Sequence, residues 1–197
     1  MNPTELEPHQ LMQRLADFME THEIAYHIVG SMASMVYGEP RFTNDVDIVV
    51  ELRTEHVPAL CAAFAPPEYY LAENAVHDAI ARKFQFNILH PASGLKVDIV
   101  LPHDTEFARS EAKRIQRISS PGEYDAWFGS PEDVLLSKLV YFQLGGGISE
   151  KHLRDIAGMM KVLREKLDRV YVSEWAAKLG VATEWTLVRK RVGEASY

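Results

Sequence analysis

Apolar residues recur along this chain with two different periods, and these periods predict its helices and strands. Within residues 8–22, the apolar positions Leu11, Leu15, Phe18 and Met19 follow helical spacing. Short apolar runs bounded by turn residues come next and predict strands. The elements predicted in this part are a helix at 8–22, a strand at 23–30, a short helix at 31–38, a strand at 45–52, a helix at 54–65, two strands within 83–101 and a hairpin within 113–129.

From residue 130 onward the helical period dominates. Ser130 is placed to cap a helix that has Pro131 at its first position and Asp133 at its third, and three glycines end that helix. A second helix, with Ser149 as its cap, and two further helices are predicted after it.

The pattern as a whole predicts an α/β (α+β) fold in two parts. Residues 1–129 are expected to form a core with a mixed β-sheet flanked by helices, and residues 130–197 a helical portion packed on it. A length of 197 residues, 47% of them hydrophobic, suits such a globular protein. We find no targeting signal at the start and no apolar run long enough for a membrane span, so we expect a cytoplasmic protein. The single cysteine, Cys61, is expected to be a packed thiol.

Charge is distributed unevenly along the chain. The net charge of −7 argues against capture of nucleic acid by the molecule as a whole. Residues 150–197 nevertheless carry 10 Lys and Arg against 7 Asp and Glu, so the acidic excess lies entirely before them. The basic run at 188–192 is typical of a solvated helix face, with contact to RNA as the alternative.

Two carboxylates, Asp45 and Asp47, open the apolar run at 45–52. Side chains alternate along a strand, so both lie on the same face, with Cα atoms about 6.5–7 Å apart. A pair of this kind can bind one divalent cation, or it can be a solvated strand end. Asp98 repeats the pattern inside a second apolar run, where an isolated carboxylate is costly unless it is paired or binds a metal.

If these two strands lie side by side, Asp45, Asp47 and Asp98 form one acidic patch. Oxygen ligands of this kind suit a hard cation, Mg²⁺ or Mn²⁺. Without a cation the three anions would repel one another. We therefore expect Asp45→Asn or Asp98→Asn to leave the stability of the metal-free protein unchanged or to raise it.

Upstream, a strand leads into Gly30 and Ser31 at the start of a helix. Backbone N–H groups and a hydroxyl at a positive helix end can bind a phosphate, and glycine permits a close approach. The alternative is a tight turn that needs glycine for its own geometry. A phosphate site beside metal-binding carboxylates is the equipment of phosphoryl or nucleotidyl transfer.

The sequence of residues 29–50, VGSMASMVYGEPRFTNDVDIVV, resembles the signature of the nucleotidyltransferase superfamily, which has the polymerase-beta-like fold. In that signature a Gly-Ser or Gly-Gly at a strand end precedes Asp-x-Asp, and a third Asp lies on a nearby strand. The chain is most similar to the abortive-infection type of nucleotidyltransferase-like toxins and related bacterial proteins. The resemblance covers about residues 24–165, because residues 130–141 and 151–160 match that group's helical Lys and Asp motifs.

The resemblance implies a catalytic role for the three carboxylates. Asp45 and Asp47 would bind Mg²⁺ or Mn²⁺, and Asp98 would complete a second metal site and help to deprotonate the attacking hydroxyl. Gly30 and Ser31 would hold the nucleotide phosphates. The implied reaction moves a nucleoside monophosphate from an NTP to an acceptor and releases pyrophosphate.

Further residues follow from the same resemblance. Lys138 would contact the triphosphate, Asp155 would orient Lys138, and Arg154 would contact the nucleotide. Arg41 is placed to reach a phosphate, and Thr43 to support the turn before the carboxylates. The alternatives are a solvated lysine at position 138 and an ordinary surface ion pair between Arg154 and Asp155.

Two functional hypotheses remain open on these grounds. The first is an active, metal-dependent nucleotidyltransferase that modifies a macromolecule, tRNA or protein, as the toxin of a toxin–antitoxin or phage-defence pair with an antitoxin partner. The second is a catalytically silent relative that binds a nucleotide or a partner protein. The presence of all three carboxylates favours the first.

Overall fold

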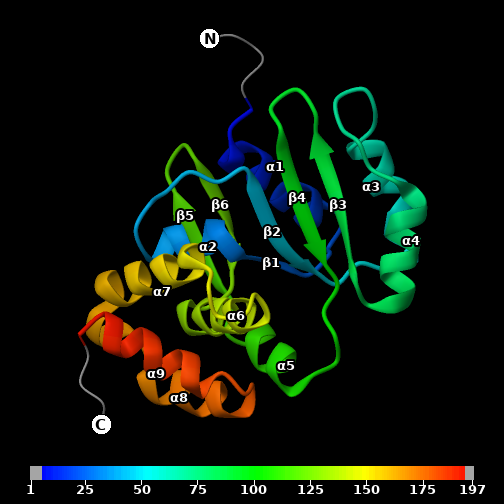
Figure 1. The fold of residues 1–197 in the computed structure, drawn as a ribbon. Coiled ribbons are helices and arrows are strands. Elements are labelled where there is room, and N and C mark those ends of the chain that lie inside the picture. Colours follow the sequence, from blue (N-terminus) through cyan, green and yellow to red (C-terminus); the bar gives the residue numbers. More distant parts are fainter. Residues whose placement is uncertain (1–5, 194–197) are drawn as a thin grey trace. The chain divides into compact units, whose positions relative to one another are not determined.

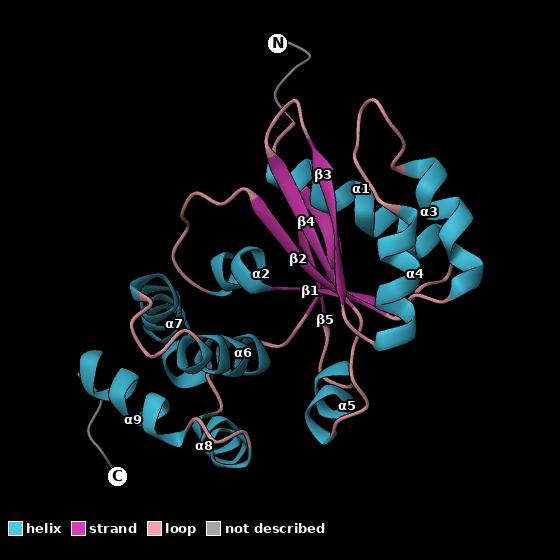
Figure 2. Cartoon of the chain, turned by 45° about the vertical axis from the view of Figure 1, so that its right-hand side comes forward, coloured by secondary structure: helices cyan, strands magenta, loops and turns pink. Residues whose placement is uncertain are grey.

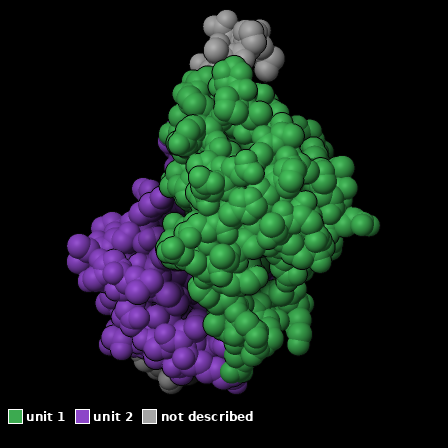
Figure 3. Space-filling view, turned by 90° about the vertical axis from the view of Figure 1, so that its right-hand side faces the viewer, with its two compact units in different colours: residues 1–29, 43–128 green, residues 30–42, 129–197 purple. Residues whose placement is uncertain are grey.

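The computed structural model describes residues 6–193 and divides the chain into two compact units, coloured separately in Figure 3. Unit 1 comprises residues 1–29 and 43–128, and unit 2 comprises residues 30–42 and 129–197. The mixed α/β architecture predicted from the sequence is confirmed. The division into two domains at residue 130 stays a prediction, and its outer ends, residues 1–5 and 194–197, lie outside the described residues.

Unit 1 contains a six-stranded mixed sheet with the strand order β3-β4-β2-β1-β6-β5 (Figure 1). The central strand β1 pairs antiparallel with β2 and parallel with β6, and β2 pairs parallel with β4. The outer pairs β3–β4 and β5–β6 are antiparallel. The strands are β1 (Tyr26–Val29), β2 (Asp45–Val50), β3 (Gln85–His90), β4 (Leu95–Val100), β5 (Gln116–Ser120) and β6 (Tyr124–Phe128).

One face of this sheet is covered by an amphipathic helix of unit 1. Helix α1 (Pro8–Thr21) buries Leu11, Leu15 and Met19, as its helical spacing predicts. Its Glu20 accepts a hydrogen bond from the hydroxyl of Tyr26 on β1 at 2.8 Å, which identifies the sheet face that α1 covers. The other helical segments of unit 1 are η1 (Thr54–His56), α3 (Val57–Ala63), α4 (Glu73–Arg82) and α5 (Glu106–Ala112).

The sequence pattern did not predict two of these helices, α4 and α5. Their apolar stripes are too thin to be recognised, because α4 buries only Val76 and Ala79 and α5 buries only Glu111. The predicted helix at 54–65 appears as η1 followed by α3. The weaker hairpin predicted within 113–129 is confirmed as β5 and β6.

Unit 2 is a helical unit built around α6 (Pro131–Leu144). This helix is buried almost all round and packs against α2, α7 and α8. The remaining helices of the unit are α2 (Gly30–Tyr37), α7 (Glu150–Leu163), η2 (Arg164–Lys166), α8 (Arg169–Lys178) and α9 (Ala182–Arg191). Figure 2 labels each of them except η2. The four helices predicted after residue 130 are thus confirmed.

The two serines predicted as helix caps behave differently. The hydroxyl of Ser130 accepts a hydrogen bond from the backbone N–H of Asp133 at 3.2 Å and donates one to the Asp133 carboxylate at 2.6 Å, and Ser130 is buried. Ser149 occupies the cap position of α7, but its side chain makes no cap hydrogen bond. Only the first serine therefore satisfies a helix end with its side chain.

We expect Ser130→Ala to lower the free energy of unfolding by about 1–2 kcal/mol, the usual loss for a capping serine, because it leaves the N–H of Asp133 buried without its partner. The matched control is Ser149→Ala, which removes a hydroxyl from the same helix position and should change stability very little. Urea denaturation of both variants measures the difference, and equal losses would contradict the capping role.

Candidate functional site

The three carboxylates predicted as metal ligands lie on two neighbouring strands of unit 1. In the parallel pair β2–β4, Asp47 lies opposite Asp98, and Asp45 lies opposite Lys96. Because residues opposite one another in a ladder share a face, and side chains two apart along a strand do so as well, all three carboxylates lie on one sheet face. The predicted placement of these two strands side by side is confirmed, and Figure 1 shows them adjacent.

Lys96 lies within this row of carboxylates, and the sequence reasoning missed it. Its Nζ is 2.7 Å from Asp98 Oδ2 and 3.8 Å from Asp45 Oδ1. The hydrogen bond to Asp98 and the charge of the neighbouring carboxylates raise the pKa of Lys96. The signal was present in the sequence, because Lys96 precedes Asp98 by two positions and therefore lies on the same face.

The expectation that these carboxylates repel one another without compensation is therefore wrong. Lys96 supplies an ammonium that neutralises part of their charge, so Asp98→Asn removes an ion pair as well as a source of repulsion. A gain in the stability of the metal-free protein is no longer expected from that substitution. Asp45 is farther from the ammonium than Asp98, so Asp45→Asn is still expected to leave the stability of the metal-free protein unchanged or to raise it.

Carboxylate oxygens are the ligands that hard cations prefer. Among residues 6–193, no group of three or more His, Cys, Asp or Glu side chains is arranged so that it could hold a metal ion. The carboxylates of Asp45 and Asp98 both approach the ammonium of Lys96, at 3.8 and 2.7 Å, so Lys96 supplies the positive charge on this face. Oxygen ligands of this kind fit Mg²⁺ or Mn²⁺ once the ammonium is displaced.

Replacing Lys96 with glutamine is expected to lower the melting temperature without metal and to enlarge the increase that Mg²⁺ produces. The variant loses a partly exposed ion pair, worth up to about 1 kcal/mol, and brings back repulsion among the carboxylates, which a divalent cation then relieves. Both effects are measured by thermal unfolding, first without Mg²⁺ and then at Mg²⁺ concentrations that increase in tenfold steps. Arg82→Gln, which breaks an exposed ion pair with Asp78, is the matched control. An unchanged response to Mg²⁺ would contradict the competition between Lys96 and the metal.

Unit 2 holds a second cluster of predicted site residues. The Arg41 guanidinium donates to both carboxylate oxygens of Asp155, at 2.7 and 2.9 Å, and to Ser31 Oγ at 2.5 Å. Lys138 Nζ donates to Asp155 Oδ2 at 2.7 Å. The buried carboxylate of Asp155 thus joins Arg41 and Lys138, and Arg41 in turn bonds Ser31 of α2.

Electrostatics hold Asp155 in its charged form. Burial by itself raises the pKa of this carboxyl, but the hydrogen bonds and charges of Arg41 and Lys138 outweigh burial and lower the pKa to about 2. The carboxylate is shared by two cations, so the three charged groups together carry one net positive charge. A positively charged group of this kind beside the start of α2 can attract a phosphate.

The alternative of a solvated lysine at position 138 is wrong. Lys138 lies on α6 among the buried residues Leu135, Leu139 and Phe142, and its side chain is 4% exposed. Because α6 packs against several helices of unit 2, polar side chains beside its apolar residues are buried as well. Asp155 accepts a hydrogen bond from this lysine, and its role in orienting the lysine stays a prediction.

Arg154 lies on another side of α7 from Asp155. The alternative of an ordinary surface ion pair between Arg154 and Asp155 is wrong, because Asp155 is buried and paired with Arg41 and Lys138. Successive residues of a helix point about 100° apart, and Arg154 is exposed on another side of α7, where it lines a pocket. Its predicted contact with the nucleotide stays a prediction.

Short stretches of chain connect the two clusters. Val29, the last residue of β1, pairs with Asp47 and directly precedes Gly30, which has a φ of 62° and so a conformation that favours glycine. Only three residues separate Arg41 from Asp45. Among them, Thr43 is buried and its hydroxyl accepts a hydrogen bond from the N–H of Asp45 at 3.3 Å, which fits its predicted supporting role.

Several solved structures are similar to this chain in fold. An antigenic nucleotidyltransferase-like protein from Paracoccidioides brasiliensis is 16% identical, with a TM-score of 0.52 over 95% of this chain and 94% of its own. ANT(2″)-Ia, in complex with adenylyl-2″-tobramycin, is 12% identical, with a TM-score of 0.56 over 90% and 98% of the two chains. The lincosamide antibiotic adenylyltransferase LnuA, bound to lincomycin, is 13% identical, with a TM-score of 0.53 over 81% and 99%.

At these identities the likeness establishes the fold alone, and the fold is that of the nucleotidyltransferase superfamily. The family model described as "Nucleotidyltransferase of unknown function (DUF6036)" matches residues 9–178, and the chain belongs to this family. No curated protein matches the chain. Among the described residues, none of the helices has the length and apolar character that a membrane crossing requires.

Proposed function

We propose that this protein is a metal-dependent nucleotidyltransferase that moves a nucleoside monophosphate from an NTP to a macromolecular acceptor. The observation that carries the proposal is the register of β2 and β4, which sets Asp47 opposite Asp98 with Asp45 on the same face. Carboxylates gathered on one sheet face are costly without a cationic partner, and the single ammonium of Lys96 neutralises only part of their charge. Family membership supplies the reaction class.

Asp45, Asp47 and Asp98 would hold Mg²⁺ or Mn²⁺. When bound, these cations neutralise charge on the attacking and leaving oxygens. Asp98 would also accept the proton of the attacking acceptor hydroxyl, whose oxygen forms the new bond to the α-phosphorus while pyrophosphate leaves. Lys96 must release Asp98 for this step, and its long side chain permits a new position in solvent.

The triphosphate would be held by residues of unit 2. The backbone N–H groups of Gly30 and Ser31 at the start of α2 bind phosphate oxygens, and the Ser31 hydroxyl adds a donor. Because Ser31 Oγ accepts from Arg41, the hydroxyl proton is directed to another acceptor. Arg41 and Lys138 supply positive charge, and Asp155 fixes both.

For the acceptor we propose a macromolecule, tRNA or protein, in the cytoplasm, with the chain acting as the toxin of a toxin–antitoxin or phage-defence pair. Support comes from the sequence resemblance to abortive-infection type toxins. The similar structures ANT(2″)-Ia and LnuA are named for antibiotics, which keeps a small molecule as the contrasting outcome.

A second candidate function is a catalytically silent protein that binds a nucleotide or a partner protein. The observation that favours it is the ion pair of Lys96 with Asp98, which competes with a metal for the same oxygens. Under this alternative, the nucleotide binds with equal strength with and without Mg²⁺.

The experiment that tests the proposal is incubation of the protein with each α-labelled NTP and Mg²⁺ in a bacterial lysate. Label that appears in RNA or protein, and is absent with EDTA, supports transfer and identifies the acceptor. Binding of NTP without any labelled macromolecule, in lysates from several bacteria, would favour the silent alternative. Label confined to small molecules would overturn the macromolecular acceptor.

A further inference from the structure

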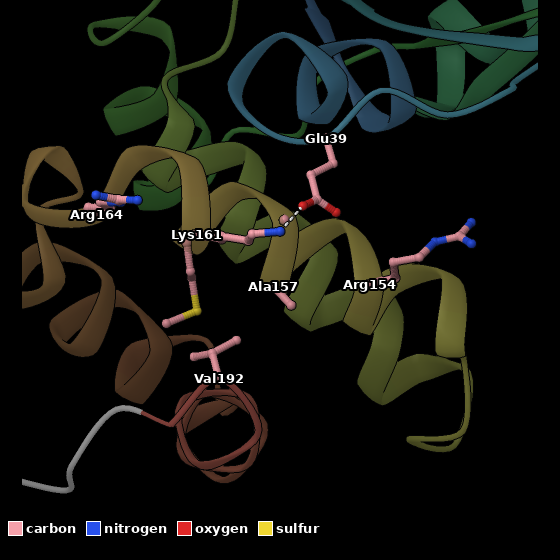
Figure 4. Close-up of a pocket in the computed structure, with 8 residues that line it drawn as sticks. Glu39, Arg154, Ala157, Lys161, Arg164 and Val192 are labelled. Carbon is pink, nitrogen blue, oxygen red and sulfur yellow. Dashed lines mark hydrogen bonds and ion pairs between the residues drawn. The ribbon is translucent and has the colours of Figure 1, made fainter.

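A pocket of about 450 Å³ lies within unit 2, along one side of α7 (Figure 4). Its walls come from α7 and η2, from Glu39 after α2, and from Val192 after α9. The residues that line it are Glu39, Arg154, Ala157, Gly158, Met160, Lys161, Arg164 and Val192.

Positive charge dominates this pocket. Arg154, Lys161 and Arg164 all line it and are all exposed, and the sole acidic residue in its wall is Glu39. Figure 4 shows Arg154 at one end of the α7 face, Arg164 at the other end and Lys161 between them. With a rise of 1.5 Å per residue, these cations extend over about 15 Å of helix axis.

The floor between the cations is small and apolar. Ala157 is small, and Gly158 lets the Glu39 segment pack close to α7, because a Cβ at position 158 would lie 3.3 Å from the Glu39 nitrogen. Met160 and Val192 add apolar surface. The pocket therefore combines separated cations with an uncharged floor.

Two wider features of charge agree with an anionic occupant. Val192 directly follows Arg189, Lys190 and Arg191, so three further cations lie next in sequence to the pocket wall, one of which, Arg191, pairs with Glu150. The acidic excess of the chain precedes residue 150, so repulsion of a polyanion by the molecule as a whole arises mainly outside this helical region.

We propose that this pocket binds the sugar–phosphate backbone of an RNA acceptor. The role of that RNA as an acceptor rests on the proposed transfer function. The cations are spread along a helix and do not surround one point, which suits several phosphates in succession and not a single phosphate group. The apolar floor suits the sugars between them. Arg154 thus serves the acceptor, and the nucleotide is left to Arg41 and Lys138.

Glu39 allows a second test of the proposal, because its carboxylate would compete with a phosphate for Lys161. Lys161 Nζ is 2.5 Å from Glu39 Oε1, and both side chains are more than half exposed. An exposed pair of this kind is weak, so a phosphate can take the place of Glu39. Removing the negative charge of Glu39 should therefore strengthen RNA binding, whereas removing the cations should weaken it.

The test is fluorescence anisotropy with a labelled single-stranded RNA, titrated with the full-length protein over a range of salt concentrations. Arg154→Gln and Arg164→Gln should each weaken binding roughly five- to tenfold at 50 mM salt and reduce the slope of log K against log salt by about 0.7. Glu39→Gln should strengthen binding. Arg82→Gln, an exposed arginine of unit 1, is the matched control and should leave affinity and slope unchanged.

Changes of opposite sign at Glu39 and at the two arginines support the proposal, because a loss of folding would weaken binding in every variant. Equal affinity of wild type and the Arg154→Gln/Arg164→Gln double variant overturns it. Binding of a polyglutamate peptide in place of RNA, dependent on the same arginines, also overturns it and assigns the pocket to a protein acceptor.

The outcome is independent of the transfer reaction. Asp47→Asn removes a proposed metal ligand on unit 1, so this variant should lose transfer and keep the RNA affinity of wild type. If wild type binds RNA as described but transfers no label, the proposed function fails and the pocket stands. If wild type labels a macromolecule but the arginine variants bind RNA normally, the pocket fails and the function stands.

Discussion

Asp47→Asn should reduce nucleotidyl transfer by about a thousandfold or more. The substitution keeps the shape of the side chain but removes the charge that would bind a cation opposite Asp98. Stabilisation of transition-state charge by a metal is worth several kcal/mol, and each 1.36 kcal/mol corresponds to a factor of ten in rate. A loss of this size is the largest functional effect that we expect from a single substitution in this chain.

Two measurements check this prediction. The first is the rate of transfer to the acceptor identified with labelled NTP, and the second is calorimetric titration with NTP, in which Mg²⁺ should strengthen binding to wild type and have little effect on the variant. Asp78→Asn, an exposed carboxylate on α4, is the control and should match wild type in both. Transfer within tenfold of wild type, or NTP binding to wild type that ignores Mg²⁺, would contradict the metal site.

Asp155→Asn should lower the free energy of unfolding by about 3–5 kcal/mol, which is the largest effect on stability that we expect. The carboxylate lies between Arg41 and Lys138, and its loss leaves the Lys138 ammonium buried with a neutral amide as its partner. Breaking a buried pair by removing one charge costs this much, whereas replacing both partners with apolar groups is often tolerated. The double variant Asp155→Asn/Lys138→Met should therefore recover part of the loss.

The pH dependence of stability gives an independent check on Asp155. Its pKa is lowered to about 2 in the folded protein, so the folded state binds the proton less readily than the unfolded state. This contribution, about 2 kcal/mol, is fully present above the unfolded pKa of about 4 and is lost as the pH falls toward 2. Asp155→Asn should show a weaker decline over that range.

Asp125→Asn is the matched control for both measurements. Asp125 also pairs with an arginine, Arg117, which lowers the pKa of its carboxyl, but the pair is exposed. Its loss should change stability far less than the loss of Asp155. A similar loss in the two variants, or a double variant no more stable than Asp155→Asn, would refute the account of Asp155 as the buried partner of two cations.

The sequence alone determined the class of fold and the identity of most site candidates. Buried apolar residues alternate with less buried residues along β2 and β4, because successive side chains of a strand point to opposite faces. The carboxylates occupy the less buried positions, so the sequence alone shows that those on one strand share a sheet face. The cap of α6 was readable from Ser130, Pro131 and Asp133 because local hydrogen bonding at a helix end depends on residues close in sequence. The Gly-Ser and Asp-x-Asp motifs identified the superfamily for the same reason, since they are local.

Tertiary structure decided which charges meet. The partners of Asp155 come from residues 114 and 17 positions away, and sequence spacing does not specify contacts across such distances. Lys138 is buried because several helices surround α6, and the apolar pattern of α6 alone does not show how many helices pack around it. Lys96 was visible two positions before Asp98, but its contact with Asp45 needed the parallel register of β2 and β4. The side of α7 that gathers Arg154 with Lys161 became a pocket only because Glu39 and Val192 pack beside it, and such packing is set by the whole fold and not by any one segment.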